Sequence, residues 1–293
     1  LPVAIGQRVL TGLGKNHVTI ALMGAQTPVV LVILLLIINF DLGDGSYLAV
    51  IPYVVTLLIS LVATVVAARL IDPQIGRALR GVPRVRTVRG GKVLDVAWPM
   101  LVQMIALPLA MQTDRLVISH VSDPANLAEY NLSAQMYLPV WQVITAAGVA
   151  LWPIFARARA KGDTRSQSPV PLSAGFAGAA AAVCIVLSLV APWLADVASG
   201  GRIELPLSML IAFSVFMTIQ GAKYPLGMFM TDASGLRYQA FFIVLMVPVN
   251  LGLSIALARR YGAIGPVIGS TVGVFFFQFV ANAVYVRRRL GDS

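Results

Sequence analysis

The chain has 293 residues, of which 58% are hydrophobic and only 12% are charged, and its mean hydropathy is +0.84. Soluble domains carry about 25% charged residues, so this composition excludes a water-soluble domain built around one core. The net charge of +10 could indicate nucleic-acid binding, but the basic residues lie at the ends of apolar runs, without an aromatic-interleaved basic surface. We therefore expect no nucleic-acid partner.

Apolar runs of about 20 residues recur along the chain, and each is long enough to cross a bilayer as a helix. Lipid offers the backbone no hydrogen-bond partners, and the runs are too continuously apolar for the alternating strands of a membrane barrel. The sequence therefore predicts an all-α, polytopic integral membrane protein. Its eight predicted spans are roughly Val18–Phe40, Tyr47–Ala68, Val96–Ser119, Leu127–Phe155, Leu172–Leu194, Leu205–Met230, Tyr238–Ala258 and Ile264–Val286.

The longest connection, residues 69–95, divides two spans from six. It is strongly basic, it is interrupted by Pro73 and Pro83, and it contains the amphipathic stretch IGRALRGV. Such a segment fits a linker that lies along anionic headgroups, or equally an ordinary solvated loop. The predicted organisation is two helices in residues 1–68, a linker in 69–95 and a six-helix bundle in 96–293.

The basic residues gather in alternate connections. Because cytoplasmic loops carry the excess of Lys and Arg, this asymmetry predicts that both ends of the chain lie in the cytoplasm. The opposite connections contain only Arg202, Arg259 and Arg260. The basic connections contain Arg8, Lys15, Arg69, Arg77, Arg80, Arg84, Arg86, Arg89, Lys92, Arg157, Arg159, Lys161, Arg165, Arg237, Arg287, Arg288 and Arg289.

Two adjacent charges, Asp114 and Arg115, lie within the third predicted span, about one turn from its outer end. On a helix they point about 100° apart and do not face each other. Arg115 could reach the outer headgroups or pair with Glu129 on the next span. Alternatively, one of the two charges faces an internal aqueous cavity, since intramembrane charges are functional by default.

Lys223 lies near the opposite end of its span, roughly 25 Å from the outer surface. It shares one helix face with Gln220, Tyr224 and Gly227. We favour snorkelling of Lys223 to the cytoplasmic interface, and we do not expect an ion pair with Asp114. If Lys223 and Arg115 instead face one cavity, they form a two-level cationic path suited to a phosphate-bearing substrate.

Other polar and small residues form stripes within the spans. Gln135 and Gln142 are seven residues apart and share a face, either for interhelical hydrogen bonds or to line a sugar-accepting cavity. Trp141 lies deep within its span, where we expect packing or, alternatively, stacking on a sugar. The last span has three glycines at a spacing of four residues, which predicts close helix packing; these are Gly265, Gly269 and Gly273.

Enzyme motifs are missing from the sequence. It contains no phosphate-binding loop, no G-x-S-x-G stretch and only two histidines, His17 and His120, without a metal-ligand cluster. We expect a protein that is not an enzyme and that needs neither a metal nor a cofactor. Active transport would then draw its energy from an ion gradient, the membrane potential or the gradient of the substrate.

Three segments carry a resemblance to known proteins: LGKNHVTIALMGAQTPVV, QTDRLVISHVSDPANLAEYNLS and RRYGAIGPVIGSTVG. In polysaccharide exporters the first is similar to the start of the fifth helix, the second to the seventh and eighth helices, and the third to the start of a late helix. The family is the O-antigen-type polysaccharide flippases of the multidrug/oligosaccharidyl-lipid/polysaccharide (MOP) superfamily. The resemblance implies two pseudo-symmetric helical lobes around a cationic cavity. The chain would hold the last two helices of the first lobe and all six of the second. It begins without Met, and we expect that its start is lacking.

The resemblance implies a bacterial cytoplasmic-membrane carrier that flips polyprenyl-diphosphate-linked oligosaccharides by alternating access. Membrane lipids and other polysaccharide-assembly proteins would be its partners. Arg115 and Lys223 are the candidate diphosphate contacts, and Gln220, Tyr224, Gln135 and Gln142 the further substrate contacts, whereas Asp114 is a structural or ion-coupling residue. The alternatives are an ion-coupled multidrug antiporter, which needs deep carboxylates, and a membrane-embedded polysaccharide-biosynthesis enzyme.

Overall fold

The computed structural model describes residues 5–40, 50–70, 91–161 and 168–291. Within these ranges all regular secondary structure is helical, and eight helices are long and apolar enough to cross a membrane. The prediction of an all-α polytopic protein is confirmed. The helices are α1 (Ile5–Gly12), α2 (Asn16–Asn39), α3 (Ile51–Leu70), α5 (Gly91–Val121), α6 (Pro124–Ala160), α7 (Pro169–Ser199), α8 (Leu207–Phe229), α9 (Ala233–Tyr261), α10 (Ile264–Val274), the π-helix η3 (Phe275–Val280) and α11 (Ala281–Gly291).

Most helices extend beyond the predicted spans. α5 begins at Gly91 instead of Val96, and α6 continues to Ala160 instead of Phe155. The reason is that an apolar run measures only the part of a helix that crosses lipid, whereas backbone hydrogen bonding continues into the polar residues at either end. The last predicted span is one continuous helical segment made of α10, η3 and α11.

The chain divides into two compact units between Arg89 and Gly90, a point inside the predicted linker. Residues 71–90, which include the amphipathic stretch of that linker, lie outside the described residues. In the first unit, the short helix α1 was not predicted. It packs against α3 so closely that a side-chain carbon added at Gly6 would lie 2.3 Å from the Cα atom of Thr64.

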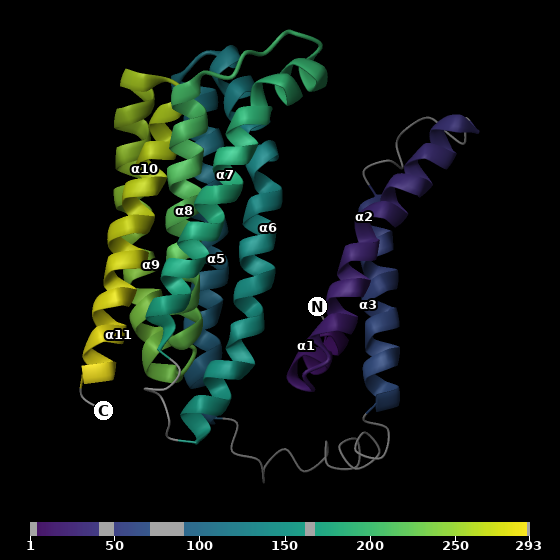
Figure 1. The fold of residues 1–293 in the computed structure, drawn as a ribbon, viewed down its shortest axis with the longest axis vertical. Helices are drawn as coiled ribbons and strands as arrows, with labels where there is room; N and C mark the ends of the chain where they lie inside the picture. Colours follow the sequence, from purple (N-terminus) through teal and green to yellow (C-terminus); the bar gives the residue numbers. More distant parts are fainter. Residues whose placement is uncertain (1–4, 41–49, 71–90, 162–167, 292–293) are drawn as a thin grey trace. The chain divides into compact units, whose positions relative to one another are not determined.

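The second unit is a bundle of α5 to α11 in which α8 contacts α6, α7, α10 and α11 (Figure 1). Its core is built mainly of large apolar side chains from α6 and α8, such as Tyr137, Met209 and Phe213. α9 contacts both α5 and α10. This arrangement brings α5, α6, α8, α9 and α10 together around the middle of the bundle.

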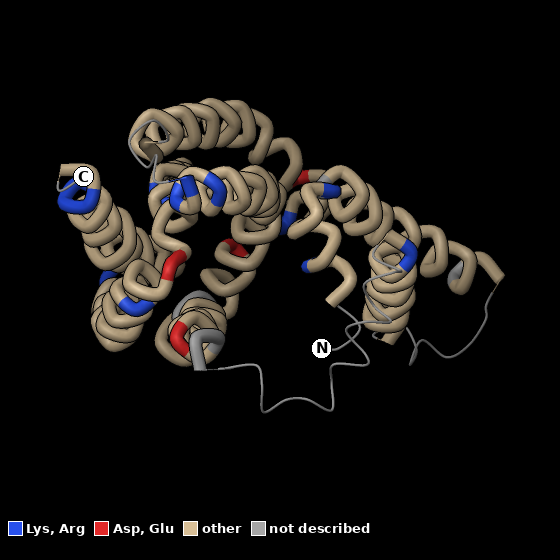
Figure 2. The backbone as a smooth tube through the Cα atoms, turned by 90° about the horizontal axis from the view of Figure 1, so that it is seen from below, with Lys and Arg blue, Asp and Glu red and all other residues tan. Residues whose placement is uncertain are grey.

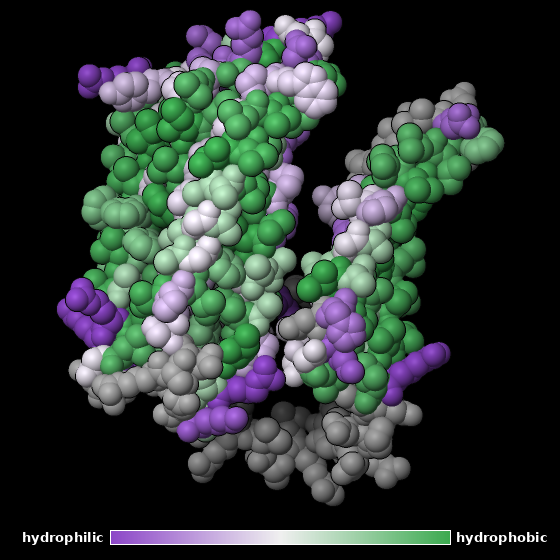
Figure 3. Space-filling view, in the orientation of Figure 1, coloured by the Kyte–Doolittle hydropathy of each residue, from purple (hydrophilic) through white to green (hydrophobic). Residues whose placement is uncertain are grey.

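The sides of the six-helix unit are apolar. The face of this unit that Figure 3 shows is mostly green, and hydrophilic residues gather at its two ends. Figure 2 shows that only a few positions along the helices carry charged residues. Large apolar side chains such as Leu189 and Val197 are more than half exposed on the surface. A surface of this kind is stable in lipid and unstable in water, so the chain is a multi-pass membrane protein.

Three glycines let α10 approach α9 closely. A side-chain carbon added at Gly265 would lie 2.3 Å from the backbone of Leu257, and one at Gly269 would lie 3.1 Å from the backbone nitrogen of Ser254. One at Gly273 would lie 3.3 Å from the side chain of Met246. The small-residue stripe therefore faces α9, as expected for such a motif in a membrane.

Candidate ligand-binding cavity

A cavity of about 400 Å³ lies inside the six-helix unit. Its wall is formed by side chains from α5, α6, α8, α9, α10 and η3. Most of the wall is apolar, with aromatic rings and a small number of polar groups, which is typical of small-molecule sites. The polar and aromatic side chains that line it include Gln112, Asp114, Arg115, Tyr130, Trp141, Gln220, Lys223, Asn250, Ser270 and Gln278.

Arg115 and Lys223 line this same cavity although they lie near opposite ends of their helices. At 1.5 Å per residue, Arg115 is about 9 Å from the end of α5 at Val121, and Lys223 is about 9 Å from the end of α8 at Phe229. α5 ends next to the start of α6, whereas α8 ends beside the end of α6, where Arg159 bonds to the carbonyl of Phe229. The two helix ends therefore lie at opposite ends of the bundle, and the cavity reaches both levels. The two cations therefore lie at two different levels of the same cavity wall.

Lys223 does not snorkel to an interface, so the interpretation favoured from the sequence is wrong. Its side chain is only 9% exposed. The ammonium donates a hydrogen bond to Oε1 of Gln278, and it lies 5.9 Å from the centre of the Trp141 ring, within the range of a cation–π contact. The aromatic ring and the amide direct the charge toward the cavity instead of toward the end of α8.

Arg115 is exposed and borders the cavity. Among the residues that the structure describes, it forms no ion pair, and the alternative pairing with Glu129 is not present. A guanidinium has five N–H donors in a planar fork that matches carboxylate and phosphate groups. Arg115 is therefore a cation that is available to an anionic ligand.

Asp114 is buried where three helices meet. Its carboxylate accepts hydrogen bonds from Ser254 of α9 at 3.0 Å and from Ser270 of α10 at 2.6 Å, and its side chain is 3% exposed. As expected, it does not pair with Lys223. The close approach of α9 and α10 that the glycines permit places both serines within reach. The acid joins α5 to its neighbours and also borders the cavity.

Two buried amides in the wall have oxygen atoms without partners. Gln220 Oε1 on α8 and Asn250 Oδ1 on α9 form no hydrogen bond within the described part of the chain, and each side chain is 2% exposed. Buried polar groups are usually satisfied, and an exception at a cavity indicates a place for water or a ligand. These amides add hydrogen-bonding capacity beside Lys223 and Trp141.

The other predicted contacts lie elsewhere. Tyr224 is half-buried and packs against Gly148 and Trp141, with ring centres 6.0 Å apart in the latter pair, but it does not line the cavity. Gln135 and Gln142 are exposed, and they are not part of the cavity wall. Their shared face lies to one side of the face of α6 that lines the cavity, which carries Tyr130, Ala134, Leu138 and Trp141.

Asn250, Ser270 and Gln278 were not proposed as site residues from the sequence. Asn250 and Gln278 are uncharged polar residues in apolar spans, a pattern that more often serves helix packing. A usable signal was the position of Ser270 directly after Gly269, on a helix whose glycine spacing indicates close contact. The π-helix at Phe275–Val280, which carries Gln278, leaves no comparable sequence pattern.

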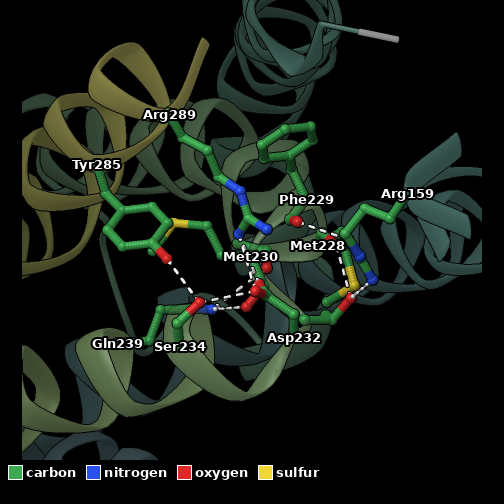
Figure 4. Close-up of polar contacts among 11 residues, drawn as sticks. Arg159, Met228, Phe229, Met230, Asp232, Ser234, Gln239, Tyr285 and Arg289 are labelled. Carbon is green, nitrogen blue, oxygen red and sulfur yellow. Dashed lines mark hydrogen bonds and ion pairs between the residues drawn. The ribbon is translucent and has the colours of Figure 1, made fainter. Parts of the chain in front are cut away.

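A second polar cluster lies where α8 ends and α9 begins, and Figure 4 shows it. It comprises Arg159, Asp232, Ser234, Tyr285 and Arg289, and we call it the end cluster. Arg289 donates to both oxygens of Asp232 at 2.9 Å, Ser234 donates to Asp232 at 2.7 Å, and Tyr285 donates to Ser234 at 3.0 Å. Arg159 donates to the carbonyl of Phe229 at 2.7 Å and to Thr231.

Burial by itself would raise the pKa of the Asp232 carboxyl. The hydrogen bonds from Ser234 and Arg289, together with the positive charge of Arg289, outweigh this effect and lower the pKa below its ordinary value. Asp232 is therefore ionised at neutral pH and fastens α11 to the start of α9.

Chemically, the cavity can bind an anionic or hydroxyl-rich group by charge, hydrogen bonds and stacking. Among the described residues, no three His, Cys, Asp or Glu side chains are grouped as metal ligands would be. No known family model, curated protein or solved structure matches the chain.

Proposed function

We propose that this protein is a carrier for lipid-linked oligosaccharides whose lipid and glycan are joined by a diphosphate. Its site is the cavity in the six-helix unit, and it binds the substrate without a chemical reaction. The observation that carries the proposal is the presence of two cations, Arg115 and Lys223, in one intramembrane cavity without a carboxylate bonded to either.

The cost of a charge inside a membrane supports this reading. Ionisable residues in membrane spans are rare, and they usually pair with one another or line a pathway for a polar solute. Asp114 is close by in the sequence and in the wall, yet it bonds to serines and leaves both cations available. A diphosphate carries the negative charge and the many acceptor oxygens that a guanidinium and an ammonium recognise.

The remaining wall suits the sugar and the lipid beside the phosphates. Trp141 offers a ring face, and Gln220 and Asn250 offer amides with unpaired oxygens, which accept hydrogen bonds from hydroxyl groups. The apolar outside of the bundle suits a prenyl chain that stays in lipid while the polar headgroup crosses. The volume of about 400 Å³ fits a headgroup and a first sugar better than a whole glycan.

The second candidate is an ion-coupled antiporter for organic molecules, and Asp114 is the observation that favours it. A buried carboxylate that borders a cavity can bind a proton or a metal cation during transport. This function shares the cavity with the first, but it uses the acid as the working group and treats the two cations as structural.

Binding of a diphosphate probe by the purified chain in nanodiscs tests the first candidate. Farnesyl diphosphate and farnesol would be titrated while tryptophan fluorescence is recorded, since Trp141 lies in the wall. We expect the diphosphate to bind at least about 10-fold more tightly than the alcohol. Arg115→Met should weaken its binding about 10-fold or more, because hydrogen bonds to charged groups contribute about 1.5–3 kcal/mol.

The matched control is Arg202→Met, which removes the same charge from an exposed loop outside the cavity. It should leave binding unchanged. Equal affinity for farnesol and farnesyl diphosphate would rule out the diphosphate as the recognised group. Tight binding of organic cations that depends on Asp114 and competes with protons would favour the antiporter instead.

We also propose that the protein lies in a bacterial cytoplasmic membrane with both ends of the chain on the cytoplasmic side. The asymmetry of Lys and Arg between connections supports this orientation. Reporter fusions after Lys161 and after Gly201 test it, because these residues lie just after two successive helices, α6 and α7. A reporter active outside the cytoplasm after Lys161 would reverse the assignment.

A further inference from the structure

The last membrane span contains a π-helix. Residues Phe275–Val280 form η3 between α10 and α11, so the whole span from Ile264 to Gly291 is continuous but changes its hydrogen-bonding pattern in the middle. π-helical turns have i→i+5 hydrogen bonds, they are rare, and they occur frequently at functional sites. Because α-helix is the usual conformation, a π-helical segment needs specific interactions that stabilise it.

Gln278 provides such interactions, because both ends of its amide are held. Its oxygen accepts a hydrogen bond from Lys223 of α8, and its nitrogen donates to the sulfur of Met246 of α9 at 3.1 Å. The side chain is buried and lies in the cavity wall. The π-helix is thus tied to the same ammonium group that is a candidate ligand contact.

Beyond η3, α11 is fastened to the start of α9 by side chains. Tyr285 donates to Ser234 at 3.0 Å, Arg289 bonds to Asp232, and Tyr238 of α9 donates to the carbonyl of Ala281 at 3.2 Å. Figure 4 shows the bonds of Tyr285 and Arg289. A π-turn holds one residue more than an α-turn, so its conversion to α-helix rotates the following helix by about 100°. These contacts hold α11 in the register that follows the π-helix.

We propose that Gln278 senses an anionic group in the cavity and passes its presence to α11. When the anion binds Lys223, the ammonium leaves Gln278, η3 relaxes to α-helix, and α11 turns and releases the end cluster. The direction follows from bond strength, because an ammonium bonds more strongly to a phosphate oxygen than to a neutral amide. The inference rests on the proposed function in one respect, namely that the ligand is anionic.

Spin-label distances in the full chain in nanodiscs test this device, the coupling of the Lys223–Gln278 bond to the rotation of α11, without any ligand. Labels would be attached at Lys161→Cys and Gly291→Cys in a Cys184→Ser background, because Cys184 is buried and unpaired with another cysteine. Lys161 is exposed, and a side chain at Gly291 would meet nothing within 4 Å. The two labels report the end of α6 against the end of α11.

Lys223→Met is the decisive variant, because it removes the donor to Gln278 but keeps an unbranched side chain. We expect a new label distance that differs by up to about 8 Å, the displacement of a point on a helix surface turned by 100°. Gln278→Met should produce the same new distance. Arg115→Met, which removes the other cavity cation, should leave the ligand-free distance unchanged.

The ligand arm uses farnesyl diphosphate, with farnesol as the neutral control. In the reference chain the diphosphate should bring about the distance seen in Lys223→Met, and farnesol should not. If both Lys223→Met and Gln278→Met keep the original distance, the device is wrong even where the diphosphate binds. If both variants shift the distance but the diphosphate neither binds nor shifts it, the device stands and the anionic substrate is wrong.

Discussion

The cavity and the end cluster use charged residues in opposite ways. In the end cluster, Arg289 is bonded to Asp232, and Arg159 is bonded to backbone and hydroxyl oxygens, so each charge connects one helix to another. In the cavity, Arg115 and Lys223 have no carboxylate bonded to them, although Asp114 lies in the same wall. A carboxylate thus neutralises Arg289 in the end cluster, whereas no carboxylate neutralises either cavity cation. Lys223 bonds only to the neutral amide of Gln278, so both cavity cations remain available to an anionic ligand.

Position explains why the molecule can have both. The end cluster lies where the bundle ends, and its members are only partly buried, so hydration offsets the cost of the charges. The cavity lies within the span, where a cation is costly unless polar groups or a ligand surround it. A buried cation without a carboxylate partner, such as Lys223, therefore indicates function more strongly than the same residue at a helix end.

The largest effect on stability should come from Gly265→Ala. This substitution disturbs the contact between α9 and α10, two helices that line the cavity, and leaves the end cluster unchanged. In a helix, alanine is normally more favourable than glycine by about 1 kcal/mol. Here the new carbon would lie 2.3 Å from the backbone of Leu257, and α9 and α10 would be forced apart. We expect destabilisation by about 2–3 kcal/mol in unfolding measurements in micelles.

Gly252→Ala is the control for that substitution, because it lies on α9 where an added carbon meets nothing within 4 Å. It should be neutral or slightly stabilising. Similar losses from both substitutions would show that α9–α10 contact is not what the glycine at 265 provides.

Asp114→Leu should have the next largest effect. It leaves the hydroxyls of Ser254 and Ser270 without their shared acceptor, which should destabilise the bundle by about 1–2 kcal/mol in the same unfolding measurements. Asp114→Asn retains an acceptor and should lose less. Asp123→Leu, at an exposed helix start without a capping bond, should lie within about 0.5 kcal/mol of the parent chain.

Asp232→Asn tests the end cluster by its pH dependence. The pKa of Asp232 is lower in the folded protein than in the unfolded chain, so its contribution is present above the unfolded value of about 3.9 and is lost as pH falls through the folded value. The melting temperature of the parent chain should therefore fall more steeply below about pH 4 than that of Asp232→Asn. Parallel profiles would contradict the assignment.

The smallest effect is expected for Asp95→Ala. Asp95 forms an ion pair with Arg237 at 2.6 Å, but both side chains are more than half exposed. Exposed pairs contribute about 0–1 kcal/mol and are screened by salt, so we expect a loss below about 0.5 kcal/mol that disappears in high salt. A larger and salt-independent loss would mean that an ion pair stabilises this protein without burial, and burial would then not distinguish the Asp232–Arg289 pair of the end cluster.

Much of the fold follows from residue pattern, whereas the site follows only in part. The apolar runs predicted eight spans within a few residues, because the cost of placing polar residues in lipid is local and repeats in every span. Arg115 and Lys223 could be singled out because a charge within such a run is rare. Gln135 and Gln142 were grouped by a shared face, but helix periodicity does not tell which face is turned toward the cavity.

The sequence by itself determined that this chain is a helical membrane protein, where its spans lie and which charges fall inside them. Tertiary structure alone decided that Lys223 bonds to Gln278 instead of reaching an interface, that Asp114 joins Ser254 and Ser270, and that both cations border one cavity. The physical reason is range. Hydropathy and helix periodicity act over neighbouring residues, whereas these contacts join helices that are far apart in the chain and depend on how closely α8, α9, α10 and η3 approach one another.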